Sequence, residues 1–189
     1  MIRQIIYSIY LAKDELVKDD TILLESDLIF EEKIIENLVS NQFPNIAVVD
    51  KYQPWMDGTV VEINNNFDIV NFVPKKDFEF SKSDLYYKTV NIYKFSKEFW
   101  KIHMCLLEAY SKALGQNEYY EQVLRVITLL ETQELKALPL QGEKWYEIDD
   151  AQDLDNANVI FAQKEEKLSL LSRRYGGYCV IVTLLISAI

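Results

Sequence analysis

Strand-like and helix-like segments alternate along the first part of the chain, and this order constrains the fold more than any other feature. TILLESD (21–27) and NIAVVD (45–50) are apolar and rich in β-branched or other strand-forming residues. Between them, EEKIIENLVSN (31–41) carries apolar residues at helical spacing. A strand, a helix and a strand within about thirty residues predict a parallel βαβ unit with a right-handed connection.

The rest of the chain continues the alternation. TVVEINNNFDIVNFV (59–73) predicts two strands joined by an Asn-rich turn, and LYYKTVNIYKF (85–95) predicts another strand. Short strands are expected at 136–141 and 144–149, and helices at 2–17, 96–115, 117–135 and 150–174. The length of 189 residues suits a single domain, and the order of elements predicts an α/β fold with an antiparallel insertion.

Charge and cysteine content exclude several classes of partner. The net charge is −10 and Lys and Arg do not cluster, which argues against duplex nucleic acid and against an anionic membrane. The two cysteines make neither a disulfide framework nor a metal cluster, so we expect a cytoplasmic protein. Cys105 lies in an apolar helical pattern and is expected in the core. His103, in the same helix, is expected to have a helix-packing or surface role rather than a catalytic one.

Two acidic residues stand at predicted strand ends. Asp27 closes TILLESD, and Asp149 closes KWYEID just before a helix. The carboxyl ends of strands in open α/β sheets are where ligands bind, and two converging carboxylates there could hold Mg²⁺. The alternatives are that Asp149 or Asp150 caps the following helix and that Asp27 is a solvated strand end.

The segment VVDKYQPWMDGTVV (48–61) is the second candidate for a binding site, because it leaves a strand and carries several interacting side chains. Lys51 could meet a phosphate group, with Asp57 beside the substrate. Tyr52 and Trp55 could form a wall against a nucleobase or an alkylammonium group. The alternative is a Pro-Gly turn with a packed Trp.

Taken in order, several segments resemble the nucleotidyltransferase family of sugar-phosphate and phosphocholine cytidylyltransferases. The segments are TILLESDLIFE, VVDKYQPWMDGTVV, YYKTVNIYKFS, YYEQVLR and KWYEIDDAQDLDNA, and RRYGGY resembles the junction to a pyridoxal-phosphate aminotransferase in bacterial fusions. The resemblance implies a Rossmann-like three-layer α/β/α nucleotide-diphospho-sugar transferase fold with a mixed sheet.

The same resemblance implies an activity and site residues. Asp27 and Asp149 match the two Mg²⁺ ligands of the family, and Lys51 matches a catalytic position on the substrate side. Glu147 shares the strand face of Asp149, which makes it a reserve ligand or a substrate-binding residue. The implied reaction is attack by the phosphate or phosphonate of a small molecule on the α-phosphate of CTP or another nucleoside triphosphate, with release of pyrophosphate.

One part of the family pattern is missing. The family begins with a strand and a glycine-rich loop that cradles nucleotide phosphates, whereas the five glycines here stand elsewhere. We therefore expect residues 1–178 to be an N-terminally truncated, impaired nucleotidyltransferase domain with an exposed sheet edge that invites self-association. The apolar tail 179–189 is expected to be a truncated or altered end, or else a buried strand.

Two other functions stay open. The missing loop and the apolar tail favour a non-catalytic binding or assembly module of the same fold. A glycosyltransferase of related fold ranks last, because that class usually requires Asp-x-Asp and this chain has Glu25 in place of the first Asp.

Overall fold

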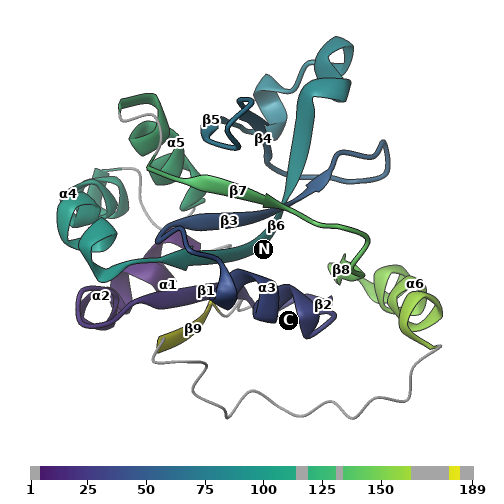
Figure 1. The fold of residues 1–189 in the computed structure, drawn as a ribbon, viewed down its shortest axis with the longest axis horizontal. Coiled ribbons are helices and arrows are strands. Elements are labelled where there is room, and N and C mark those ends of the chain that lie inside the picture. The colour runs from purple at the N-terminus through teal and green to yellow at the C-terminus, as the bar shows by residue number, and fades with distance from the viewer. Residues whose placement is uncertain (1–4, 114–118, 131–133, 163–178, 184–189) are drawn as a thin grey trace.

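The computed structural model describes residues 5–113, 119–130, 134–162 and 179–183, and Figure 1 shows a mixed sheet with helices on both of its faces. The helices are α1 (Ile5–Leu11), α2 (Lys13–Leu16), α3 (Lys33–Ser40), α4 (Lys97–Ala113), α5 (Glu121–Leu130) and α6 (Ala151–Phe161), with 3₁₀ turns at Lys75–Asp77 and Phe80–Leu85. The strands are β1 (Thr21–Glu25), β2 (Leu28–Phe30), β3 (Ile46–Lys51), β4 (Val60–Ile63), β5 (Ile69–Val73), β6 (Tyr86–Phe95), β7 (Lys136–Pro139), β8 (Trp145–Glu147) and β9 (Cys179–Thr183).

The long strand β6 organises the main sheet. It pairs antiparallel with β1, with β3 and with β4, while β7 continues the sheet beyond β3 and β5 continues it beyond β4. Because β1 and β3 both run antiparallel to β6, they are parallel to each other, as the βαβ pattern predicts. However, β6 lies between them, so the two strands are not direct neighbours. The β4–β5 hairpin confirms the predicted antiparallel insertion.

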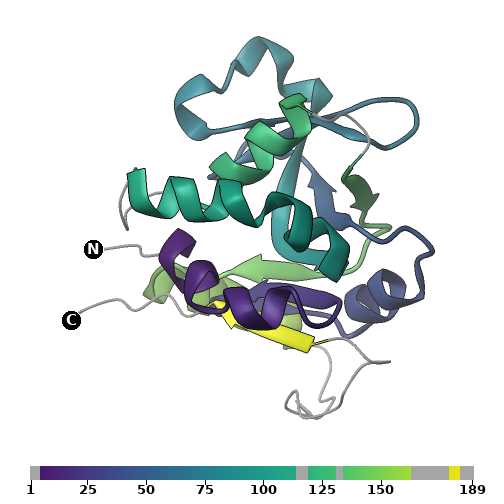
Figure 2. The ribbon, with the colours of Figure 1, turned by 90° about the vertical axis from the view of Figure 1, so that its left-hand side faces the viewer.

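Alternating side chains divide the core into two layers. Leu23 of β1 packs with α1, α4 and α5 on one face of the sheet, and its neighbours Ile22 and Leu24 pack with α3 on the other face. Figure 2 shows α1, α4 and α5 gathered on the side that faces the viewer. Each fully buried aliphatic side chain contributes about 1.5–3 kcal/mol. These two cores confirm the predicted three-layer α/β/α arrangement.

The segment expected as one helix over 2–17 is divided within its described part. A turn at Ala12 separates α1 from α2. The predicted cap of α4 is confirmed, since the backbone N–H of Phe99 donates to Ser96 Oγ at 3.2 Å. Only 151–161 of the helix predicted for 150–174 is described as α6, and residues 163–174 lie outside the described ranges.

Asp150 begins α6 through a capping box. Its side chain accepts hydrogen bonds from the backbone N–H groups of Gln152 and Asp153, at 2.8 and 3.0 Å. The Asp153 carboxylate in turn accepts from the backbone N–H of Asp150. We predict that Asp150→Ala lowers the free energy of unfolding by about 1 kcal/mol in urea denaturation, whereas Asp150→Ser retains most of the stability. Equal losses in the two variants would contradict the capping role.

The free side of β1 is covered by the C-terminal segment. Residues 179–183 form β9, which runs parallel to β1 in the register Thr21↔Cys179 to Glu25↔Thr183. This side of β1 is therefore not an exposed edge, and among the described strands the outer side of β9 forms the edge of the sheet. This strand agrees with the alternative reading of the tail, whereas residues 184–189 lie outside the described ranges.

Helix α4 contains one expectation that is confirmed and one that is wrong. His103 is buried and packs on the ring of Phe99 at 4.8 Å, as expected. Cys105 is exposed rather than part of the core, because it lies on the outward side of the helix. Among the described residues, no helix combines the length and apolar character needed to cross a bilayer.

Candidate functional site

Three carboxylates meet where β1 ends. Glu25 is the last residue of β1, and Asp27 follows in the turn to β2. Antiparallel pairing of β2 with β8 places Leu28 opposite Glu147, and the backbone N–H of Ile148 donates to the carbonyl of Asp27 at 2.8 Å. As a result, carboxylate oxygens of Glu25, Asp27 and Glu147 lie within 4.8 Å of one another. We call these three residues the acid cluster.

Asn91 of β6 fixes two members of the acid cluster. Its amide nitrogen donates to Glu25 Oε2 at 3.0 Å and lies 3.4 Å from Glu147 Oε1. The hydroxyl of Thr89 donates to the amide oxygen of Asn91 at 3.0 Å, which orients the amide toward the acids. Asn91 has a φ of 60°, a left-handed conformation that asparagine tolerates better than most residues. This conformation interrupts the regular course of β6 at the level of the cluster.

One buried cation, Lys88, lies beside the acid cluster. The side chain of Lys88 is 3% exposed, and its ammonium lies 3.6 Å from Glu147 Oε2. It also donates to the carbonyl of Thr89 at 3.0 Å and lies 6.0 Å from the ring centre of Trp145. A buried ammonium is stable only near compensating negative charge, so Lys88 and the carboxylates stabilise each other.

Burial and repulsion between carboxylates raise the pKa of Glu25 and of Glu121. Burial raises the pKa of Glu25 well above its ordinary value, and the charges of Glu121, Glu147 and Asp27 raise it further, while Lys88 opposes them. Burial likewise raises the pKa of Glu121, the first residue of α5, to about 7. A divalent cation would relieve this repulsion, and the all-oxygen donor set fits a hard cation such as Mg²⁺.

Asp149 lies between β8 and α6, at the predicted strand end, but it is not a member of the acid cluster. It follows β8 and is exposed, and its backbone N–H donates to Asp153 Oδ2 at 3.1 Å. The N-cap residue of α6 is Asp150 and not Asp149. The alternative that one of these two residues caps the helix is therefore confirmed for Asp150 alone. Because Ile148 is bonded to Asp27, the chain at Asp149 passes the same rim of the sheet as Asp27. The group of three close carboxylates nevertheless contains Glu25 and Glu147 rather than Asp149.

The aromatic wall has a different partner from the one expected. Trp55 is 61% exposed and stacks on Tyr146 of β8, with ring centres 5.9 Å apart and planes inclined by 10°. Tyr52 instead packs against Phe78, at 5.0 Å between ring centres, and is half-buried. Sequence reasoning missed Tyr146, because its contact with Trp55 forms only in the folded chain. The pair of exposed Trp55 and half-buried Tyr146 therefore adjoins the acid cluster through β8.

The turn after Trp55 covers Lys88. Asp57 is exposed and accepts a hydrogen bond from Lys75 at 2.6 Å, which lowers the pKa of Asp57. Gly58 has a φ of 94°, and a Cβ at this position would lie 3.3 Å from Lys88 Nζ. Both the backbone conformation and the close approach of the ammonium favour glycine here.

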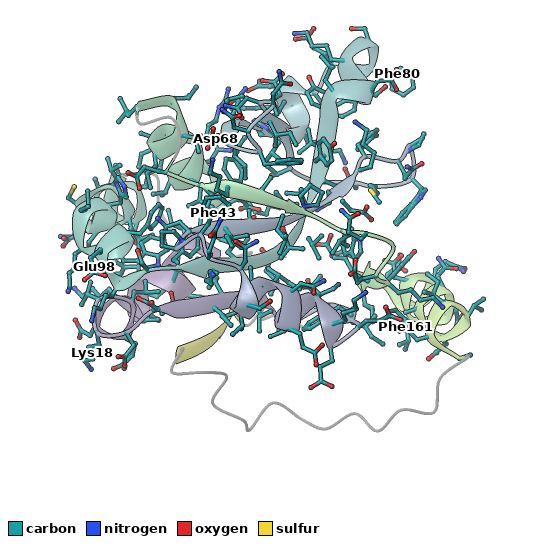
Figure 3. The ribbon with its side chains drawn as sticks, in the orientation of Figure 1. Lys18, Phe43, Asp68, Phe80, Glu98 and Phe161 are labelled. Atoms are coloured by element: carbon teal, nitrogen blue, oxygen red, sulfur yellow. The ribbon has the colours of Figure 1, made fainter. Side chains whose placement is uncertain are left out.

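Lys51 faces a groove along β3 and β7. Its ammonium donates to the carbonyl of Asp84 at 2.5 Å and lies 4.5 Å from the ring centre of Tyr87. The groove is mainly apolar, and Figure 3 labels Phe43, one of its lining residues, near β7. None of the acid cluster is among the groove's lining residues, all of which belong to the described part of the chain. The structure thus places Lys51 on a different surface from the three carboxylates.

Comparison with known proteins agrees with this fold. No family model matches the chain. Its sequence is 25% identical over 178 residues to the CMP-5′-(3-aminopropyl)phosphonate synthase of Streptomyces rubellomurinus, a match that covers 90% of this chain. The chain spans only 27% of the length of that protein.

Solved structures give the same result. The structure of CTP:phosphocholine cytidylyltransferase from Streptococcus pneumoniae matches with a TM-score of 0.68 and 12% identity, covering 84% of this chain and 64% of that one. The inositol-1-phosphate CTP transferase of T. maritima matches with a TM-score of 0.57 and 16% identity, covering 78% of this chain and 56% of that one. The chain therefore has the mixed α/β, Rossmann-like fold of nucleotidyltransferases, and the resemblance seen in the sequence is confirmed.

Proposed function

We propose that this chain is a nucleotidyltransferase domain that binds Mg²⁺ at the rim of β1 and β8. It would transfer a nucleotidyl group from CTP or another nucleoside triphosphate to a phosphorylated or phosphonate-bearing small molecule. The observation that carries the proposal is the acid cluster at the carboxyl end of β1, where Glu25, Asp27 and Glu147 lie within 4.8 Å of one another. In open α/β sheets this rim is the usual place for ligands.

The proposal gives Asp27 the role of a metal ligand, with Glu147 of the acid cluster close enough to join it, and keeps Asp149, which follows β8, as the second predicted ligand. Bound Mg²⁺ would neutralise the charge that develops on the transferred phosphate. Asn91 and Lys88 hold Glu147 in place from the floor of the site through the contacts at 3.4 and 3.6 Å. The carboxylates would thus be positioned before a cation arrives, which reduces the cost of binding it.

The exposed side chains around the rim would hold the acceptor molecule. Trp55, stacked on Tyr146, offers a flat aromatic surface for a nucleobase or an alkylammonium group, and Asp57 could pair with a cationic substituent. Tyr52 supports this loop through Phe78. We do not assign Lys51 its predicted catalytic role in this proposal, because its ammonium donates to the carbonyl of Asp84 on a different surface from the acid cluster.

The proposal predicts that removing the Asp27 charge weakens cation binding. In calorimetric titration with Mn²⁺ as a substitute for Mg²⁺, Asp27→Asn should bind at least about tenfold more weakly than the wild-type protein, because one charged oxygen ligand is lost. Asp14→Asn, at an exposed acid of α2, is the matched control and should bind like the wild type. Equal affinity in all three proteins would disprove the metal site, and titration of CTP with Mg²⁺ then tests nucleotide binding.

A further inference from the structure

We infer that β9 is a docking strand whose pairing with β1 holds the acid cluster in its binding geometry. The inference concerns an interaction surface, the free side of β1, and its occupant, residues 179–183 of the same chain. It deepens the proposed function, because the effect on cation binding rests on the metal site proposed above. Figure 1 shows β9 beside β1 at the edge of the sheet.

The register of the two ladders on β1 carries the inference. Pairing with β6 covers Thr21 to Leu24, opposite Phe95 to Ile92. Pairing with β9 covers the same residues and also reaches Glu25, opposite Thr183. The ladder with β6 stops where Asn91 takes its left-handed conformation, with a φ of 60°. Of these two described ladders, the β1–β9 ladder therefore orders the backbone of Glu25, because the β1–β6 ladder ends at Leu24.

The side chain of Glu25 shows why this backbone matters. Glu25 is 6% exposed, and its carboxylate is fixed by Asn91 at 3.0 Å and belongs to the acid cluster. The turn that carries Asp27 begins directly after Glu25. A backbone that opens at Glu25 would therefore move two of the three carboxylates at once. Groups that orient the ligands of a metal site typically change metal affinity by about 10–100-fold when they are removed.

The composition of β9 suits a strand that pairs through backbone hydrogen bonds and has no ion pairs of its own. Its sequence CVIVT contains three β-branched aliphatic residues and one threonine, with no charged residue and no proline. In the described structure β9 pairs with β1 and with no other strand. Because β1 is its one strand partner there, removing β9 leaves the order of the other described strands of the sheet unchanged, although β9 also contacts α1.

Removing residues 179–189 tests the inference with two independent measurements. Hydrogen exchange of those amides in Thr21–Glu25 that face β9 should become faster in the shortened protein, and Mn²⁺ affinity should fall about tenfold. Adding a synthetic peptide of residues 178–189 should restore both properties. Unchanged exchange of these amides, or unchanged Mn²⁺ affinity after their exchange has become faster, would overturn the inference. If the 189-residue chain fails to bind Mn²⁺ at all, the proposed function is instead disproved, while the exchange experiment still decides whether β9 docks.

A pair of point variants keeps the test valid if the shortened protein does not fold. In a parallel ladder, the N–H groups of successive residues point to opposite sides of the strand. Of Val180→Pro and Ile181→Pro, one therefore removes a hydrogen bond to β1 and the other removes an N–H on the outer edge. The two variants should differ clearly in exchange of the β1 amides that face β9, and equal behaviour would contradict docking through the ladder. If the 189-residue chain elutes as a monomer in size exclusion, pairing within one chain is supported, whereas a dimer that is lost on removing 179–189 would contradict it.

Discussion

The Lys88→Met variant is expected to lose about 3–5 kcal/mol of unfolding free energy, since it removes one partner of a buried charge pair. Lys88 is 3% exposed and its ammonium lies 3.6 Å from Glu147, and it is the cation that opposes the raised pKa of both Glu25 and Glu121. Methionine has a similar length and fills the space, so the loss reports charge rather than packing. Urea denaturation at pH 7 measures it.

Lys94→Met is the matched control for this variant. Lys94 lies on the same strand and is equally buried, but the hydrogen bond described for its ammonium goes to the neutral carbonyl of Asn41, at 2.8 Å. We expect a loss of about 1 kcal/mol for Lys94→Met, because a hydrogen bond is lost and no carboxylate of the acid cluster is left unbalanced. Equal losses in the two variants would mean that Lys88 does not stabilise the cluster by its charge.

The layered fold was accessible from the sequence because short-range patterns determine it. The alternation of Ile22, Leu23 and Leu24 between two apolar faces and the helical spacing in 31–41 each depend on neighbours within a few residues. The order of strands was not accessible in the same way. The insertion of β6 between β1 and β3, and the pairing of β9 with β1, depend on contacts between residues far apart in the chain.

For the same reason, only some members of the acid cluster could be named as candidate ligands from the sequence. A strand end marks Asp27, and the capping preference of Asp150 leaves Asp149 outside the helix cap. Glu147 became a member of the acid cluster through the pairing of β2 with β8, and Glu25 through a hydrogen bond from Asn91, which lies 66 residues away. Local sequence contains no signal for such a contact. The partner of Trp55 was missed likewise, since Tyr146 reaches it only in the folded chain.

A second large effect is expected from pH, through Glu121. The pKa of this buried carboxyl is about 7 in the folded protein, against an ordinary value of 4.5. Between these two values the unfolded chain has released the proton while the folded chain still holds it, so the stability that this group contributes is lost as pH rises. A difference of this size corresponds to about 3 kcal/mol, lost between about pH 4.5 and pH 7 and constant above that range.

Glu121→Gln removes this titration and keeps the size of the side chain. Between pH 5 and pH 8 the wild-type protein should lose about 3 kcal/mol more unfolding free energy than the variant loses. Urea denaturation at the two pH values measures this difference. The exposed acid Glu98 of α4 provides the control, because Glu98→Gln changes a side chain that is 60% exposed and should leave the wild-type pH dependence intact. If Glu121→Gln also retained the wild-type pH dependence of stability, the titrating buried carboxyl would have to be another residue. Glu25, whose pKa is also raised, would then be the next residue to substitute.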